Sequence, residues 1–136
     1  MANVKDIEGI GPVLGEKLEK AGIVTVESLL ESGSTRAGRA NIAKESGISE
    51  SQVLEFVNMA DLMRIKGVGG EFAELLKAAG VDTIKELRTR NAENLHQKLE
   101  ETNAAKSLTR RVPSLDMTKD FIAHAGSTDP AVTYYT

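Results

Sequence analysis

Apolar residues recur along the chain with the spacing of a helix, and one such stripe occurs twice. Leu14, Leu18 and Ala21 lie at positions i, i+4 and i+7, which places them on one face of a helix. The same spacing returns 58 positions later, in the stretch "EFAELLKAAG". The alternation of apolar and polar residues that marks a half-buried strand appears nowhere in the chain. The pattern therefore predicts an all-α protein that contains a repeated unit.

A Gly-hydrophobic-Gly segment precedes each copy of the stripe, at residues 9–11 and at residues 67–69. Glycine permits a positive φ and a close approach of backbones, so each segment predicts a tight turn that leads into a helix. Pro12 suits the first turn of the helix after residues 9–11, because an N–H at that position has no partner within the helix and its loss costs nothing. On the premise that φ is positive at Gly11 and Gly69, we expect valine at either position to destabilise the protein by roughly a few kcal/mol or more.

The two copies align without a gap over residues 7–33 and 65–91, which indicates a duplicated structural unit. Further along, the correspondence is looser. The stretch "LEFVNMA" (54–60) resembles "KDFIAHA" (119–125) at a larger offset of 65, so the second copy carries about seven extra residues. We place these extra residues near "AAKSLTRRVP".

These limits divide the chain into a first unit (1–62), a second unit (63–126) and a C-terminal tail (127–136). Within the first unit, the pattern predicts a helix that breaks at Gly47 and a further helix capped by Ser49. The connecting stretch "VNMADLMRIK" contains no Gly, Pro or Ser, so we expect a rigid helical junction rather than a flexible linker.

Composition narrows the class of protein. Aromatic residues make up 4% of the 136 residues, so the core must be aliphatic. The absence of Cys excludes disulfides, thiol catalysis and Cys-ligated zinc. No apolar run approaches the ~20 residues of a membrane span, and "MANVKDIEGIG" lacks the apolar region of a secretory signal. We therefore expect a cytoplasmic protein with no membrane partner.

The charge is acidic overall but unevenly spread. A net charge of −3 and a pI near 5.5 count against a strongly nucleic-acid-binding protein, which usually has a basic face. Residues 85–111, however, carry seven Lys and Arg against four Glu. An anion-facing surface is therefore expected there, with an ordinary solvated face of mixed charge as the alternative.

The sequence offers little catalytic chemistry. His96 and His124 are the only histidines and lack the close spacing of a metal-ligand pair. There is no nucleophile elbow and no phosphate-binding loop ending in Gly-Lys-Ser/Thr. Residues 42–57 have the layout of a helix-turn-helix, but the candidate recognition helix carries Glu50 and Glu55 and no cation, which favours ordinary helix packing. We expect no enzymatic activity, no cofactor and no metal.

At "IEGIGPVLGEKLEKAGI" (7–23) and "IKGVGGEFAELLKAAGV" (65–81) the chain resembles the helix-hairpin-helix motif. That motif is a hydrophobic-x-Gly-hydrophobic-Gly hairpin, followed by a helix with a small residue near its fourth position, here Gly15 and Ala73. The stretches "GRANIAKESGIS", "VNMADLMRIKGVG", "LLKAAGVDTIKEL" and "RRVPS" further resemble an uncharacterised bacterial family annotated only as a domain of unknown function. The resemblance implies two fused helix-hairpin-helix units of SAM-like fold, packed through a rigid helical junction.

The helix-hairpin-helix resemblance also implies weak, sequence-independent binding of double-stranded DNA. Hairpin N–H groups and the following helix N-terminus would face a phosphate, and in some relatives hairpin carbonyls hold a monovalent cation. The chain departs from this pattern, because residues 12–13 and 70–71 lack the Lys or Arg that DNA-binding hairpins often carry there, and Glu8 would repel a phosphate. The residues expected to bind phosphate are Gly9, Gly11, Lys17, Lys66, Gly67, Gly69, Arg88, Arg90, Arg110 and Arg111.

Two other interpretations stay open. In the first, the glycine turn is purely structural: it makes a tight corner so that two helices can pack, and the duplication completes a shared core. In the second, the chain is a protein-interaction or assembly module that presents grooves between its helices and binds no nucleic acid. The acidic pI and the scarcity of aromatic residues fit this module at least as well as DNA binding.

Overall fold

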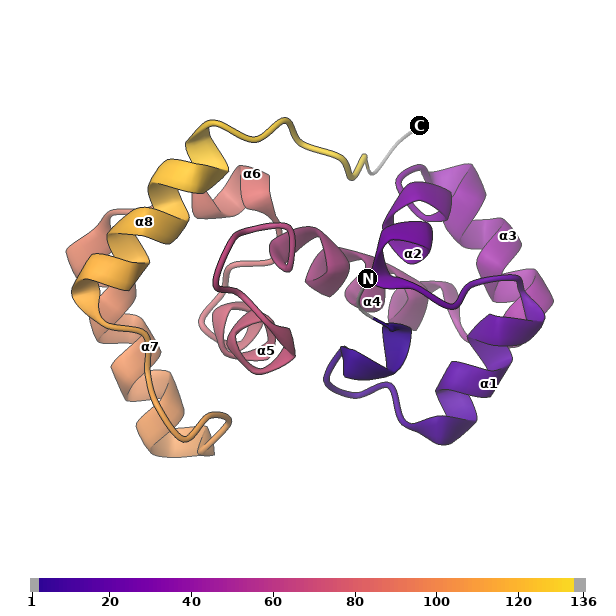
Figure 1. Ribbon diagram of the computed structural model, residues 1–136, viewed down its shortest axis with the longest axis horizontal. Helices are drawn as coiled ribbons and strands as arrows, with labels where there is room; N and C mark the ends of the chain where they lie inside the picture. The colour runs from indigo at the N-terminus through magenta and orange to yellow at the C-terminus, as the bar shows by residue number, and fades with distance from the viewer. Residues whose placement is uncertain (1–2, 134–136) are drawn as a thin grey trace. The chain divides into compact units, whose positions relative to one another are not determined.

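The computed structural model describes residues 3–133 and contains eight α-helices and one short 3-10 helix (Figure 1). No strand occurs among these residues, and the one extended pairing is an isolated bridge between Asn3 and Thr25. The all-α expectation is therefore confirmed. The described residues up to Asp61, together with Ala131–Thr133, form one compact unit (unit 1), and Leu62–Pro130 form a second (unit 2).

Unit 1 contains the 3-10 helix η1, helices α1 to α3 and nearly all of α4. Its helix ends follow local sequence signals. Thr25 accepts the Ser28 N–H at the start of α2 (3.0 Å), and Thr35 caps α3 in the same way. Gly47 ends α3 with a φ of +78°, so the break expected there is confirmed. The elements are η1 Val4–Asp6, α1 Pro12–Lys20, α2 Val26–Ser32, α3 Arg36–Ser46 and α4 Glu50–Leu62.

The core of unit 1 is aliphatic, as the composition predicts. Leu18 of the predicted α1 stripe is fully buried, while Leu14 and Ala21 at its ends are half-buried. η1 lies directly against α1, because a Cβ added to Gly15 would come within 2.7 Å of the Lys5 side chain. The small residue near the fourth helical position thus permits this close approach. Other buried side chains of the unit include Ile7, Ile10, Ile23, Leu29, Ile42, Val53 and Val57.

Unit 2 contains four helices: α5 Gly70–Ala78, α6 Ile84–Leu87, α7 Ala92–Lys106 and α8 Leu115–Gly126. α8 packs against both α6 and α7, and α7 and α8 lie side by side in Figure 1. α5 packs against α7. The fully buried aliphatic side chains of this unit include Leu75, Leu76, Ile84, Leu87 and Leu99.

The extra residues of the second copy lie where the sequence places them. α7 has 15 residues, against 11 in α3, and the loop 107–114 that follows α7 is longer than the loop that follows α3. Two side chains order this loop: Asn103 donates to the Thr109 carbonyl (3.0 Å) and accepts the Thr109 N–H (2.9 Å), and the Thr109 hydroxyl donates to the Arg111 carbonyl (2.8 Å). The insertion therefore extends one helix and orders its own connection.

Two further expectations concern the junction after α4 and the tail after α8. α4 continues without interruption to Leu62, so the first part of the expected junction is helical, while its rigidity stays a prediction. α8 ends at Gly126, after which the chain is not helical, apart from a turn, as far as Thr133. Thr133 donates its N–H to the Ser34 carbonyl (2.8 Å). The last three residues of the expected tail, 134–136, lie outside the described residues.

Candidate nucleic-acid interface

Two hairpins with nearly the same backbone geometry precede α1 and α5. In the first, the Ile10 N–H donates to the Ile7 carbonyl (3.1 Å), and Gly9 has a φ of +93°. Residues 65–68 repeat this bond (3.0 Å), with Gly67 at a φ of +92°. A four-residue turn with a positive φ at its third residue has the arrangement of a type II turn, for which glycine is favoured. The sequence repeat is therefore also a repeat of backbone conformation.

Both hairpins end at a helix N-terminus that no side chain caps. Gly11 and Gly69 are the N-cap residues of α1 and α5, and both are exposed. The first helical bond of each helix comes from Gly15 (2.8 Å) and Ala73 (2.9 Å), so the amides before them have no acceptor within the helix. The other six α-helices of the described chain are each capped by a side chain, from Thr25, Thr35, Ser49, Thr83, Asn91 and Ser114.

The premise that Gly11 and Gly69 have a positive φ is wrong. Their φ values are −89° and −95°, with a ψ of −170° at both, which is extended backbone that any residue adopts. A Cβ added at either position would meet nothing within 4 Å. The constraint lies two residues earlier, at Gly9 and Gly67, because a type II turn places the positive φ at its third residue.

A buried phenylalanine lies against the first glycine of each hairpin. A Cβ added at Gly9 would lie 3.8 Å from Phe56 of α4, and one added at Gly67 would lie 3.2 Å from Phe121 of α8. Phe121 also meets Phe72 of α5, with ring centroids 6.3 Å apart. The resemblance between residues 54–60 and 119–125 was the sequence signal for this pair, but the signal did not show that the two rings support the hairpins.

The central residues of the two hairpins differ in charge and in contacts. Glu8 stands in the first hairpin and Lys66 in the second, and both are exposed. The Lys66 N–H donates to Nδ1 of His124 on α8 (3.1 Å), which requires that nitrogen to be unprotonated. Met59 stands at the matching position of α4, and its thioether is only a weak acceptor. His124 therefore joins α8 to the second hairpin, a role that the sequence did not predict.

Most of the cations predicted to bind phosphate are not part of a hairpin. Lys17 is half-buried in the last turn of α1, and Arg88 is the exposed C-cap of α6. Arg110 and Arg111 are exposed in the loop before α8, whereas His124 contacts the hairpin about 15 Å further along that helix. Lys66 is the predicted cation that lies in the second hairpin itself.

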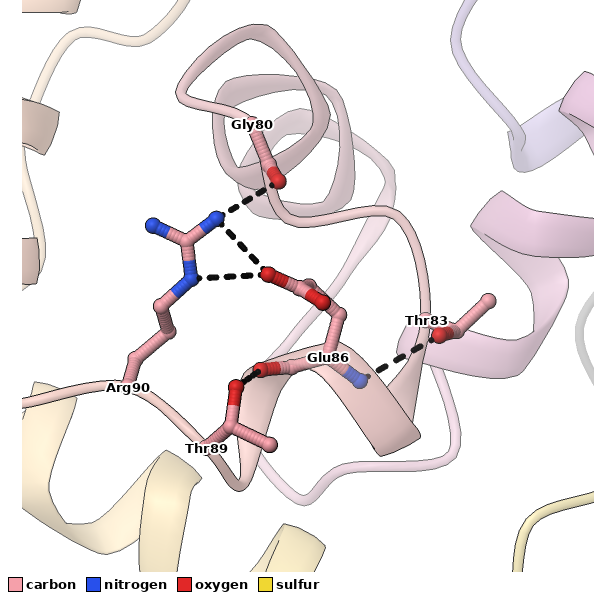
Figure 2. A network of polar contacts seen from close by, with 5 residues as sticks. All are labelled: Gly80, Thr83, Glu86, Thr89 and Arg90. Atoms are coloured by element: carbon pink, nitrogen blue, oxygen red, sulfur yellow. Dashed lines mark hydrogen bonds and ion pairs between the residues drawn. The ribbon is translucent and has the colours of Figure 1, made fainter.

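Arg90 takes part in a polar network at the end of α5 opposite to the hairpin (Figure 2). Its guanidinium donates to the Gly80 carbonyl (2.9 Å) and to the Glu86 carboxylate (3.1 Å). Thr83 and Thr89 bind the Glu86 N–H and carbonyl (3.4 and 2.7 Å), which fixes the short helix α6. Arg90 therefore satisfies a carbonyl just beyond the C-terminus of α5, where a cation is favoured, and its guanidinium is engaged away from the hairpin amides.

Residues 3–133 contain neither a metal-ion cluster nor a membrane-spanning helix. No group of three or more His, Asp or Glu side chains there could hold a metal ion. None of the described helices is both long enough and apolar enough to cross a membrane. His96 is half-buried, with Nδ1 3.3 Å from the Glu100 carboxylate one helical turn away.

The family described as a domain of unknown function, DUF4332, matches residues 8–128. The chain belongs to this family. The matched region includes Gly9, Gly11, Gly67 and Gly69 and both supporting phenylalanines. The search of curated proteins and the search of solved structures found no match. The expected membership of an uncharacterised family is confirmed.

Proposed function

We propose that the two repeats are helix-hairpin-helix units that bind double-stranded DNA weakly and without sequence preference, through backbone amides. The observation that carries this proposal is the pair of uncapped helix N-termini at Gly11 and Gly69, because side chains cap the six other α-helices of residues 3–133. Orphan N–H groups and the positive end of the helix dipole together attract an anion such as phosphate.

The second hairpin suits a phosphate better than the first. α5 offers the three consecutive amides of residues 70–72, whereas Pro12 removes one of the corresponding amides from α1. Lys66 adds a positive charge within the second hairpin, while Glu8 adds a negative charge to the first. Glu71, in the first turn of α5, opposes the approach of an anion. Binding should therefore be weak, with the larger share from unit 2.

The few cations set the expected affinity. If about three to five phosphates are neutralised, log affinity should fall with log salt at a slope of about −3 to −4.5. The dissociation constant at physiological salt should then be no tighter than about 10 μM. Base sequence should matter little, because backbone amides and isolated cations contact phosphates and carry no information on bases.

The substitution Gly69→Asp tests the amides directly. An aspartate at the N-cap accepts the amides of α5 and adds a negative charge, so it should keep or slightly raise the melting temperature. Binding to duplex DNA at low salt should nevertheless fall by about tenfold, the equivalent of one charge-assisted hydrogen bond. Gly69→Ala is the matched control, since its extended backbone accepts a Cβ and an alanine caps nothing.

Fluorescence anisotropy with a labelled random duplex, at about 20 and 150 mM salt, measures both the affinity and its slope. Arg110→Glu combined with Arg111→Glu should weaken binding through long-range charge without unfolding the protein, because both side chains are exposed. Absence of binding at the lower salt would contradict the proposal. Equal losses in Gly69→Asp and Gly69→Ala would show that the amides are not the binding groups.

A second candidate function rests on the first hairpin. Val13, in the first turn of α1, is 68% exposed and directly follows the exposed Pro12, and the acidic Glu8 of the same hairpin is also exposed. An apolar and acidic tip suits a contact with a partner protein better than a contact with phosphate. Val13→Lys separates the two functions: it should raise duplex affinity by a few-fold if this hairpin faces DNA, because it adds one phosphate contact. Unchanged duplex affinity would favour the protein contact.

A further inference from the structure

A surface cavity of about 300 Å³ lies within unit 2, next to the polar network of Figure 2. Its lining comes from Ala79 at the end of α5, from the loop residues 89–91 and from the first turns of α7. Small-molecule sites usually have volumes of about 300–1,000 Å³, so the cavity is large enough for a small ligand. The second hairpin precedes the other end of α5, so this cavity is separate from the candidate nucleic-acid interface.

The lining combines two buried apolar residues with a set of polar side chains. Ala79 and Leu95 are 4% and 2% exposed. Asn91, Asn94 and Lys98 lie at positions i, i+3 and i+7, which places them on one face of α7. No carboxylate is among the described residues that line the cavity. The cavity therefore offers donors and an apolar surface without a negative charge of its own.

Arg90 is held so that one part of its guanidinium remains available. Nε donates to Glu86 (3.1 Å) and Nη2 donates to Gly80 (2.9 Å), while Figure 2 shows the third nitrogen, Nη1, pointing away from both partners. Glu86 offsets part of the positive charge of Arg90, but it also fixes the planar group. A ligand that binds Nη1 therefore does not have to immobilise a free arginine side chain.

The polar residues of α7 also have donors available. The Asn91 side-chain oxygen accepts the Asn94 N–H (3.0 Å), which leaves the Asn91 Nδ2 group free to donate to a ligand. Lys98 is exposed and takes part in no hydrogen bond or ion pair within residues 3–133. The acidic Glu93, in the first turn of α7, is exposed and does not line the cavity. Two cations and at least one amide donor thus surround the same space.

The packing of the repeat does not account for these donors. In the gap-free alignment of the two copies, Arg90 and Asn91 match Ser32 and Gly33 of the first copy, and Thr89 matches the acidic Glu31. The first copy therefore forms the equivalent corner without a cation at this position. The cations of the cavity are a feature of unit 2 alone rather than a requirement of the shared fold.

We propose that this cavity is a binding site for a small phosphate monoester. A phosphoryl group carries a charge of about −1.5 to −2 and three acceptor oxygens, which suits two cations and an amide donor. A carboxylate has one charge and two oxygens and would leave part of this set unused. The organic part of the ligand would contact Ala79 and Leu95. An engineered cavity of about 150 Å³ accommodates benzene, so this cavity has room for a ring beside the phosphoryl group.

Phenyl phosphate is a suitable probe, and amide NMR spectra of the full-length protein report where it binds. At about 150 mM salt, the side-chain amides of Asn91 and Asn94 should shift and saturate with a dissociation constant on the order of 1 mM. Inorganic phosphate should bind severalfold more weakly, because it lacks the apolar group. Benzoate should also bind severalfold more weakly, because it carries a single charge.

Lys98→Gln tests the cavity through its exposed cation. The substitution should weaken phenyl phosphate binding about fivefold, as for one charge-assisted hydrogen bond at an exposed position. Lys106→Gln makes the same charge change on the same helix outside the cavity, and should leave the affinity unchanged. Gly69→Asp, which alters the hairpin at the other end of α5, should also leave it unchanged. Far-UV circular dichroism of each variant reports whether the helices remain intact.

Four results would overturn the proposal. The first is the absence of saturable shifts at Asn91 and Asn94 up to about 10 mM phenyl phosphate. The second is an equal loss of affinity in Lys98→Gln and Lys106→Gln, which would indicate attraction by net charge alone. The third is inorganic phosphate or benzoate that binds as tightly as phenyl phosphate, which would show that the apolar residues or the second charge take no part. The fourth is displacement of phenyl phosphate by random duplex DNA, which would make the cavity part of a DNA-binding surface instead.

Discussion

The two hairpins share a backbone and differ in the chemistry that it presents. The φ values of Gly9 and Gly67 agree within one degree, and each glycine faces a buried phenylalanine. Outside these positions the copies diverge, with the acidic Glu8 in one hairpin and Lys66, bound to His124, in the other. The turn and its aromatic support follow from packing, whereas solvent-facing positions can change without affecting the fold. Shared geometry therefore does not imply that both hairpins bind the same partner.

The corners between the first two helices of each copy also differ. In unit 1, the Val4 N–H of η1 donates to the Val24 carbonyl (2.9 Å), so η1 provides the donor for a carbonyl at this corner. In unit 2, Arg90 binds the Gly80 carbonyl instead, and Ser32 stands at its matching position in unit 1. Both solutions supply donors to backbone groups that would otherwise lack them. A duplicated corner can thus be stabilised by a neighbouring segment in one copy and by a side chain in the other.

The strongest test of the shared geometry removes its aromatic support. Phe56→Ala and Phe121→Ala should each destabilise the protein by about 3–5 kcal/mol, because each deletes a buried ring beneath a hairpin. Denaturant unfolding followed by circular dichroism measures the loss. Met117→Ala, at an exposed position of α8, is the control and should change stability by about 0.5 kcal/mol or less. A small effect for one phenylalanine alone would show that the two hairpins are supported differently.

The next largest effect concerns the glycines with positive φ. Gly67→Ala should cost about 2–3 kcal/mol, because it combines backbone strain with a tight contact to Phe121. Gly9→Ala should cost about 1–2 kcal/mol, since the contact with Phe56 is of ordinary length. Gly11→Ala and Gly69→Ala serve as controls and should change stability by less than about 1 kcal/mol. The reverse order, with the controls more damaging, would contradict the assigned turn.

Arg90→Ala is expected to have a smaller effect. The substitution removes the bonds to Gly80 and Glu86, but the Arg90 side chain is 34% exposed, so the loss should be about 0.5–1 kcal/mol. Thermal unfolding of Arg90→Ala is compared with that of Arg88→Ala, which also removes one arginine charge, at an exposed position at the end of α6. A larger loss in Arg90→Ala is due to the bonds of the network rather than to the charge. If Arg90→Ala instead lowers the salt slope of duplex binding and leaves stability unchanged, the Arg90 side chain contacts DNA after all.

The smallest effect is expected from a substitution that gives the second hairpin the supporting residue of the first. His124→Met introduces the residue that stands at position 59 and removes the acceptor of the Lys66 N–H. Global stability should fall by about 0.5 kcal/mol, while hydrogen exchange of the Lys66 amide should accelerate severalfold. Unchanged exchange in His124→Met would mean that this bond does not hold the hairpin.

Much of the fold could be predicted from the sequence, and so could the two hairpins of the candidate site, but not the positions of its cations. The stripe around Leu18, the break at Gly47 and the duplicated glycine turns are local features, and the structure has each of them. The insertion in the second copy also follows from a change of offset between matching stretches. The cations of the site could not be placed, because their positions depend on how α6, α7 and α8 fold back against each other.

Periodicity, capping residues and glycines act on near neighbours, so they specify the helices, the repeat and the places where the backbone must turn before any tertiary contact forms. Which polar groups meet depends instead on how the helices pack. His124 binds an amide 58 positions away, and Arg39 binds a carbonyl 94 positions away. A guanidinium or imidazole can bind many partners, so its identity in the sequence does not specify one. Only the packing of the helices brings a particular amide or carbonyl within hydrogen-bonding distance.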